Sequence, residues 1–398
     1  MVFIIIIIAA AVILLFLITK PVQKYSMCPR GGPRWKNCLG YLLIRAGVKR
    51  GKTDTVTDPV QINSRVPAPE GTPEDQYNDS FVFQGADEKG NLVMTRIGFR
   101  DGGKLAEVWL WMSLNGTKFY NSNQFIRFDT PDISGLEAGG LRFQCTDKNR
   151  GQWRIEWEGA LEPGPADCSV ALHFTPDSKL YHSGIHMDIR AFARAMAEMD
   201  WSKQFFENLR SENQTRIEQG GTLAGSITIG GKTTHVEMRG VRDHSWGKRK
   251  WSFIKRYIWN VLSFSEGISL GGNTYRYLVY TTVNYGTSFR CLVSGWIGGD
   301  DSVLPIVAAT DQAQLGEDGV IPEQFTCRFK PKGCGAVELT VFRNGLEQSW
   351  FMQNGEFEVC EAYCTFKAKG PEGAGSGVGM SEFGYSKAAG YSKRFIDG

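Results

Sequence analysis

From residue 81 onward, short apolar runs rich in β-branched and aromatic residues alternate with turns rich in Gly, Asn and Asp. Runs of this length at this spacing are typical of an all-β sandwich or barrel, not of alternating strands and helices. The pair Asn115-Gly116 between two such runs predicts a tight hairpin. Only residues 186–210 break the pattern, because apolar residues there recur every three or four positions, which predicts a helix. The pattern indicates two strand-rich parts joined by a helical connection.

The first apolar run is different in length and composition. Residues 2–19 carry no charge, and as a helix they would span ~27 Å at ~1.5 Å per residue, enough for a thin bilayer. No basic residue precedes the run and no small-residue cleavage site follows it, so we expect an uncleaved anchor, not a signal peptide. The later segment 39–48, apolar with basic flanks, is interpreted either as a helix on the membrane surface or as an ordinary core helix.

Charge adds an orientation to this anchor. The net charge is only +3, but residues 20–60 hold nine Lys and Arg residues against two Asp. The positive-inside rule therefore predicts a single-pass protein, placed in the endoplasmic reticulum membrane, whose globular part faces the cytosol. Sequons at Asn78, Asn115 and Asn213 favour the lumen instead, whereas nine irregularly spaced cysteines fit reduced thiols.

These observations predict an all-β fold of two tandem β-barrel or sandwich domains behind an N-terminal transmembrane helix. Polar, proline-containing residues 51–80 read as a linker. The predicted divisions are an anchor (1–20), a basic juxtamembrane segment and linker (21–80), a first β domain with its connecting helix near 186–210 (81–212), a second β domain (213–390) and a tail (391–398).

No cofactor motif is complete. Ser226 stands where a phosphate-binding loop ending at Gly231-Lys232-Thr233 needs glycine, and residues 373–379 do not form a dinucleotide fingerprint. The spacings of Cys327, Cys334, Cys360 and Cys364 differ from those of zinc knuckles. We therefore expect neither a cofactor nor a metal.

Residues 242–247 bring unusually varied chemistry together: Arg242-Asp243-His244-Ser245-Trp246-Gly247. On a strand, alternation places Arg242, His244 and Trp246 on one face and Asp243 and Ser245 on the other. We expect His244 to face an apolar cavity with Trp246 beside it, where an imidazole can transfer protons. On this interpretation His244→Ala abolishes turnover and leaves stability nearly unchanged. The alternative is an ordinary core histidine beside a structural Arg–Asp pair.

The run G-x-R-D-H-S-W-G-x-R resembles the motif of the hydroxyneurosporene synthase (carotenoid hydratase) group, which is related to lipocalin-like Diels–Alderases. The stretch Glu218-Gln219-Gly220-Gly221 and the closing segment 377–385 add to the resemblance. It implies two tandem lipocalin-like β domains with an apolar ligand cavity near their junction.

The resemblance also implies roles for individual residues. His244 and Trp246 match cavity positions, and Asp243 and Arg242 match positions that brace them. The full set of expected catalytic residues is His244, Asp243, Glu218 and Glu382, and the expected substrate-binding residues are Trp246, Arg242, Trp251 and Trp259. The group is expected to carry a Tyr/Asp pair on the strand after the motif, where this chain has Trp259 and Asn260 but no clear acid. This departure leaves carotenoid hydration itself open.

Three functions remain at this stage. The first is a cofactor-independent hydratase, cyclase or isomerase acting on a polyene, isoprenoid or lipid-like substrate at the membrane. The second is a non-catalytic lipid or pigment carrier. The third assigns the basic, aromatic stretch 248–259 to nucleic acid or anionic lipid. We expect an apolar small-molecule ligand and the membrane as partners, and no nucleic acid; the oligomeric state is left open.

Overall fold

The computed structural model describes residues 32–50, 58–129, 135–164, 167–211, 214–249, 251–285, 288–310 and 321–386. The predicted anchor at residues 2–19 lies outside these ranges. Among the helices within them, none combines the length and the apolar character needed to cross a bilayer.

The first part of the chain forms one antiparallel sheet in the order β4-β3-β2-β1-β12-β11-β9-β8-β7-β6, with β5 pairing to β3 and β10 to β11. Its strands are β1 (Tyr77–Ala86), β2 (Leu92–Arg100), β3 (Leu105–Leu114), β4 (Thr117–Tyr120), β5 (Phe125–Arg127), β6 (Glu137–Ala138), β7 (Leu141–Asp147), β8 (Gln152–Gly159), β9 (Cys168–Pro176), β10 (Tyr181–His182), β11 (Gln214–Ile229) and β12 (Lys232–Lys248). The predicted hairpin at Asn115-Gly116 joins β3 to β4, and both residues have the positive φ that such a turn requires.

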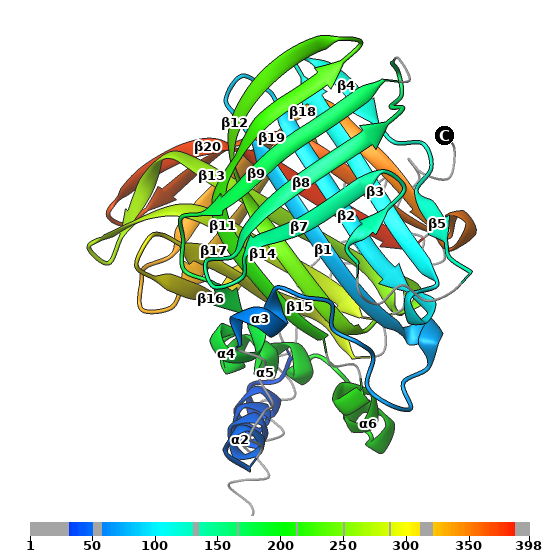
Figure 1. Ribbon diagram of the computed structural model, residues 1–398. Helices are drawn as coiled ribbons and strands as arrows, with labels where there is room; N and C mark the ends of the chain where they lie inside the picture. Colours follow the sequence, from blue (N-terminus) through cyan, green and yellow to red (C-terminus); the bar gives the residue numbers. More distant parts are fainter. Residues whose placement is uncertain are drawn as a thin grey trace, which may run out of the picture.

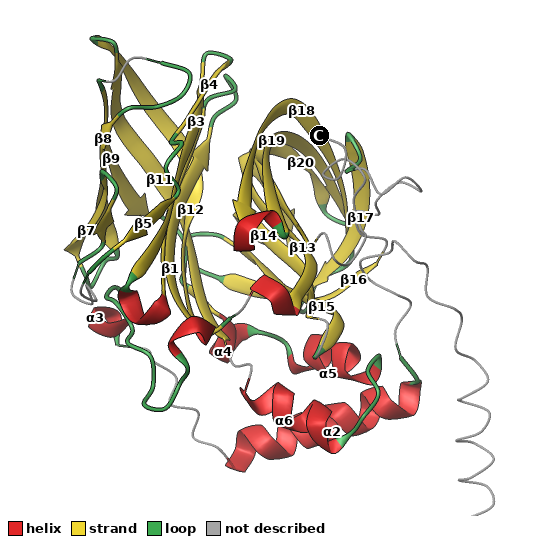
Figure 2. Ribbon diagram, turned by 90° about the vertical axis from the view of Figure 1, so that its right-hand side faces the viewer, coloured by secondary structure: helices red, strands yellow, loops and turns green. Residues whose placement is uncertain are grey.

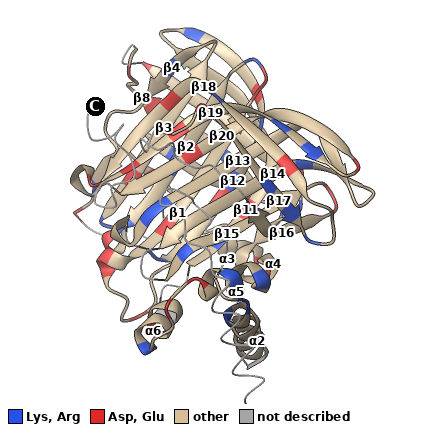
Figure 3. Cartoon of the chain, turned by 180° about the vertical axis from the view of Figure 1, so that it is seen from behind, with Lys and Arg blue, Asp and Glu red and all other residues tan. Residues whose placement is uncertain are grey.

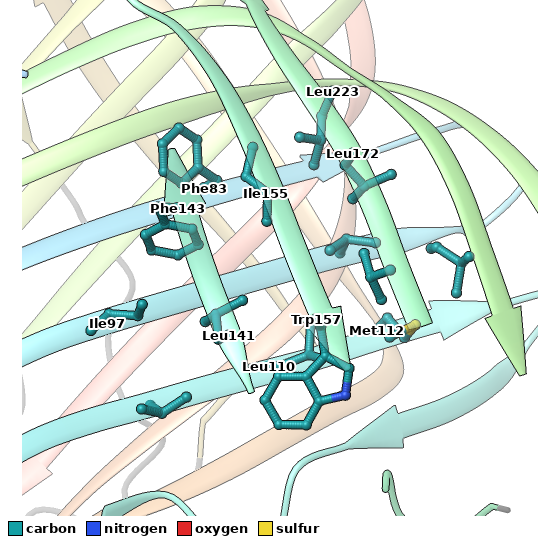
Figure 4. Close-up of a cluster of buried hydrophobic side chains, with 14 of the residues drawn as sticks. Phe83, Ile97, Leu110, Met112, Leu141, Phe143, Ile155, Trp157, Leu172 and Leu223 are labelled. Atoms are coloured by element: carbon teal, nitrogen blue, oxygen red, sulfur yellow. The ribbon is translucent and has the colours of Figure 1, made fainter. Parts of the chain in front are cut away.

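This sheet curls so that its two halves pack against each other (Figure 2). The ring of Phe83 on β1 lies 4.9 Å from that of Phe143 on β7 and 5.7 Å from that of Phe174 on β9, measured between centroids. Figure 4 shows the resulting core, in which side chains of β1–β3 meet side chains of β7–β9 and β11. The concave face of the sheet is therefore filled by its own side chains.

The second part is a closed eight-stranded barrel, in which each strand pairs with the next and β13 pairs with β20. Its strands are β13 (Ile254–Leu270), β14 (Asn273–Tyr285), β15 (Phe289–Gly298), β16 (Val303–Thr310), β17 (Gln324–Pro331), β18 (Val337–Met352), β19 (Phe357–Gly370) and β20 (Gly373–Ser386). Strict alternation on β17 sends Phe325, Cys327 and Phe329 into the interior, where they join a buried apolar cluster. An eight-stranded barrel is narrow enough for side chains to fill.

The helices gather at one end of the molecule (Figure 1). They are α2 (Arg34–Arg50), α3 (Pro59–Ile62), α4 (Ser183–His186), α5 (Ile189–Ala197) and α6 (Lys203–Ser211), with short 3₁₀ turns η1 (Glu74–Gln76), η2 (Asp101–Gly103), η3 (Trp251–Phe253) and η4 (Gln353–Gly355). The helix expected over 186–210 is thus two short helices, α5 and α6, and α4 precedes them. The segment 39–48 lies in α2, which packs on α5 yet leaves Leu39, Leu42 and Leu43 exposed.

The convex face of the first sheet packs on the outside of the barrel. Trp109 of β3 stacks on Trp350 of β18 with centroids 5.5 Å apart and planes 7° from parallel. Strands β1, β2 and β3 and the second half of β12, from Gly240 on, are consequently buried on both faces, against their own sheet on one side and the barrel on the other. The two-part all-β architecture agrees with the sequence-based expectation.

Two expectations differ from the structure. The division between the two sheets falls between Lys248 and Ile254, not at 212–213, because β11 pairs with β9 and β12 pairs with β1. The other concerns the cysteines: their spacing favoured reduced thiols, whereas Cys291 of β15 is disulfide-bonded.

Candidate functional site

A cavity of about 270 Å³ lies between the convex face of the first sheet and the barrel, beside the helical end. This volume is near the lower limit of ~300 Å³ for ligand pockets. Aromatic and aliphatic side chains from both sheets and from the helices dominate its wall, among them Val82, Trp109, Phe192, Leu209, Trp251, Ile254, Trp259, Val283, Phe289 and Leu292. The charged or hydroxylic residues that line it are Ser80, Arg96, Ser183, Arg216, Asp243, Ser245, Arg249, Tyr257, Thr281, Tyr285, Ser288, Ser294 and Glu382.

Alternation along β12 is as predicted, but the faces are reversed. Asp243 and Ser245 line the cavity, whereas Arg242, His244 and Trp246 point to the opposite side of the sheet. The prediction that His244 and Trp246 face this cavity is therefore wrong. Because β12 is buried on both faces, alternation separates two sets of side chains without saying which set meets the cavity.

His244 is instead part of a packed junction. Its Nδ1 lies 2.9 Å from the carbonyl oxygen of Ile62, its Nε2 lies 2.8 Å from Oδ1 of Asp79, and its ring stacks on Phe81 at 3.7 Å. Trp246 lies alongside, with ring centroids 4.6 Å apart. His244 is 1% exposed and ties α3 to the first sheet.

Arg242 serves the same junction. Its Nη1 donates to Oδ1 of Asn63 at 2.7 Å, and its Nε and Nη2 both donate to Oε1 of Gln219. Burial lowers the pKa of this guanidinium to about 10. Asp243, on the other face, pairs with Arg216. Arg242 and Asp243 are thus both paired, but on opposite faces of the sheet and with different partners.

Asp243, Arg216 and Glu218 form one cluster at the cavity wall. Nε of Arg216 lies 3.0 Å from Oδ2 of Asp243, and its Nη1 lies 3.6 Å from Oε1 of Glu218. Trp259 and Trp296 donate their indole N–H groups to Glu218 at 3.2 and 2.7 Å. Burial raises the pKa of Asp243 and raises that of Glu218 to about 7, against the opposing effect of Arg216. Two carboxyl groups beside a single guanidinium therefore tend to retain a proton.

A second carboxyl pair lies on the barrel side. Glu361 of β19 and Glu382 of β20 are direct cross-strand neighbours, and the hydroxyl of Tyr257 donates to Oε1 of Glu382. Burial and the neighbouring Glu382 raise the pKa of Glu361 well above its usual range. Glu361 also accepts the indole N–H of Trp350 at 3.0 Å. Burial and the adjacent Glu382 thus favour the protonated form of Glu361, and Glu382 faces the cavity beside Tyr257.

The other predicted site residues have clear positions. Trp251 and Trp259 line the cavity, as do Asp243 and Glu382, and Glu218 lies behind Trp259. Sequence reasoning missed Arg96, Arg216, Tyr257 and Glu361. The Tyr/acid pair sought on the strand after the motif is divided between strands: Tyr257 is on β13, and β20 supplies the acid, since Trp259 pairs with Glu382 across the barrel closure.

No group of three His, Cys, Asp or Glu side chains that could hold a metal occurs in the described ranges. The cavity offers instead two proton-holding carboxyl pairs, one on each wall, in aromatic surroundings. Such an arrangement can donate and accept protons away from bulk water.

Comparison with known proteins places the chain in a family. The family described as "Domain of unknown function (DUF7064)" matches residues 64–384, so the chain belongs to it. No curated protein matches the sequence.

Three solved structures are similar in fold. A protein of Nitrosomonas europaea assigned as AttH (NE1406) has 12% identity and a TM-score of 0.52, covering 80% of this chain and 98% of its own. CghA has 10% identity and a TM-score of 0.50, covering 84% and 97%. Kievitone hydratase from Nectria haematococca has 13% identity and a TM-score of 0.46, covering 81% and 94%. The resemblance to the two-domain β group, predicted from the motif at 240–249, is confirmed; at these identities it concerns the fold alone.

Proposed function

We propose that this member of the DUF7064 family is a cofactor-independent hydratase, cyclase or isomerase of an apolar polyene, isoprenoid or other lipid-like substrate. The observation that carries the proposal is the chain Glu361–Glu382–Tyr257, which brings a retained proton to the wall of an aromatic cavity. A carboxyl group kept protonated by its environment is a common device for acid catalysis near neutral pH.

In this reaction Glu361 passes its proton to the adjacent Glu382, and the Glu382–Tyr257 pair gives a proton to one carbon of a C=C bond. The positive charge that develops on the other carbon lies among Trp109, Trp251 and Trp259, whose ring faces attract cations. Return of a neighbouring proton to Glu382 completes an isomerisation, and attack by a second double bond followed by the same proton return completes a cyclisation. In a hydration, water attacks the cation and gives its proton to Asp243 on the facing wall.

We further propose that the helical end lies at the membrane, anchored by residues 2–19, so that substrate enters from the bilayer. Exposed Leu39, Leu42 and Leu43 on α2 support this placement. Lys and Arg residues also gather on α2 and α5 (Figure 3), as suits an anionic lipid surface. Phe192 of α5 and Leu209 of α6 line the cavity at this end.

The test uses full-length protein purified in detergent from a lipid-rich host. The co-purifying ligand is extracted, identified and returned to the protein, and its conversion is followed by mass spectrometry. We expect Tyr257→Phe and Glu382→Gln to lower kcat about 100-fold or more, the usual effect of losing a general acid, while binding persists. Tyr275→Phe, which alters a buried tyrosine of the barrel interior outside the cavity, is the matched control and should retain turnover.

Wild-type protein that binds its ligand without converting it would identify a carrier instead. Variants that convert the ligand at the wild-type rate would exclude Tyr257 and Glu382 from the chemistry.

A further inference from the structure

Arg96 carries one N–H donor for which the described part of the protein provides no acceptor. This residue of β2 is 3% exposed and lines the cavity wall. Its Nε donates to Oγ of Ser80 at 3.0 Å and its Nη2 donates to Oε2 of Glu107 at 2.7 Å. Its Nη1 is buried and has no acceptor among the described protein atoms. A buried guanidinium N–H without an acceptor is costly, so it points to a ligand.

The charge around Arg96 has the matching sign. Arg96 and Arg100 share a single carboxylate, Glu107, at 2.7 and 3.4 Å. Burial alone would raise the pKa of Glu107, but Arg100 and Arg96 lower it to about 2, so it is ionised. Within this group two guanidinium groups share one carboxylate, so the second positive charge has only Glu382 across the cavity to balance it, and no ion pair joins the two. Burying a charge is expensive unless it is paired, and an anionic group in the cavity would pair it.

The guanidinium is also held in place before any ligand arrives. It lies over the ring of Trp109 at 4.2 Å, and a Cβ added at Gly98 would come within 2.3 Å of Nη2. Only glycine at position 98 leaves room for this orientation. A fixed, planar guanidinium suits the planar carboxylate better than a flexible ammonium would.

We propose that the cavity binds an apolar molecule that carries a carboxylate, and that this carboxylate pairs with Nη1 of Arg96. The inference rests on the proposed function and adds the substrate's head group: an unsaturated lipid-like acid, not a pure hydrocarbon. The proton donor lies on the facing barrel wall, and Arg96 is close enough to Glu382 to lower the pKa of that carboxyl against the effect of burial. The head group therefore positions the chain of the substrate across the aromatic residues.

The test compares two probes that differ only in charge: parinaric acid, a fluorescent conjugated polyene acid, and its methyl ester. Full-length protein in non-ionic detergent is titrated with each at neutral pH, and binding is read by energy transfer from the cavity tryptophans. We expect the acid to bind about tenfold tighter than the ester or more, the effect of one hydrogen bond to a charged group. Arg96→Gln should reduce this preference to about twofold or less.

Arg100→Gln is the matched control, because Arg100 pairs with the same Glu107 but does not line the cavity; the preference should persist. Equal affinity of wild-type protein for acid and ester, or binding of neither, overturns the inference without needing any variant. A preference that survives in folded Arg96→Gln protein also overturns it. If the protein prefers the acid but does not convert the co-purified ligand, only the proposed catalysis is contradicted. If it converts the ligand but binds acid and ester with equal affinity, only the proposed carboxylate head group is contradicted.

Discussion

Replacing His244 with Ala should destabilise the protein and leave the cavity's chemistry intact, the reverse of what the motif alone suggests. The side chain makes a hydrogen bond to the Ile62 carbonyl, a second to the Asp79 carboxylate, and a stacked contact with Phe81. A hydrogen bond that involves a charged group contributes about 2 kcal/mol, and aromatic stacking contributes about 1 kcal/mol. Asp79 keeps the Arg65 guanidinium at 2.6 Å, so no uncompensated charge is added. We expect a loss of about 3–5 kcal/mol in the free energy of unfolding.

The neighbouring residue provides the matched comparison. Asp243 lies on the same strand but faces the cavity, and Asp243→Asn keeps its shape while Glu218 remains to pair with Arg216. Urea unfolding should therefore show a large loss for His244→Ala and a change within about 1 kcal/mol for Asp243→Asn. Binding and turnover per folded molecule should show the opposite order. A stable His244→Ala protein that loses turnover would refute this reasoning and restore His244 as a catalytic residue.

Three further outcomes are expected. Burial raises the folded-state pKa of Glu218 from 4.5 to about 7, so its contribution to stability is complete below pH 4.5 and is lost as the pH rises to about 7. In urea titrations, the free energy of unfolding of wild-type protein should therefore fall by up to about 3 kcal/mol across this range relative to that of Glu218→Gln. The same pH dependence of stability in both proteins would contradict the shift. Gly220→Ala should destabilise by about 1–3 kcal/mol, because its Cβ would lie 2.3 Å from the Tyr277 ring, whereas Gly373→Ala, with open space around it, should be neutral in thermal melts. If the globular part faces the cytosol, as the basic flank favours, the exposed sequon at Asn115 carries no glycan, and glycosidase treatment leaves the protein's gel mobility unchanged. A mobility shift would place this part in the lumen, the side that the disulfide at Cys291 favours.

The strands were predictable because their signals are local. Alternation and turn residues are sufficient to locate β3, β4 and the hairpin between them. The partners of β11 and β12 were not predictable in the same way. A hairpin at Gly230-Gly231 shows that these two strands pair with each other, but nothing nearby in sequence shows that β12 inserts beside β1. The predicted division at 212–213 assumed that strands following the helices begin the second sheet, whereas these strands complete the first.

The candidate site shows the same limit at the level of single residues. The motif strand concentrates attention on residues 242–247, and one of its two faces does meet the cavity. Choosing the face requires knowing that the barrel packs on the convex side, a fact that depends on contacts between β1–β3 and β13–β20. Tyr257, Glu361 and Glu382 come together only because the first strand of the barrel closes against its last. A candidate site assembled across a sheet closure leaves no spacing signature in the sequence, whereas a histidine that connects one helix to one strand lies inside a compact motif. A strand segment with many chemically distinct residues therefore marks a tightly packed part of the structure. The polar groups that line a cavity and lack a partner are the better guide to the candidate site.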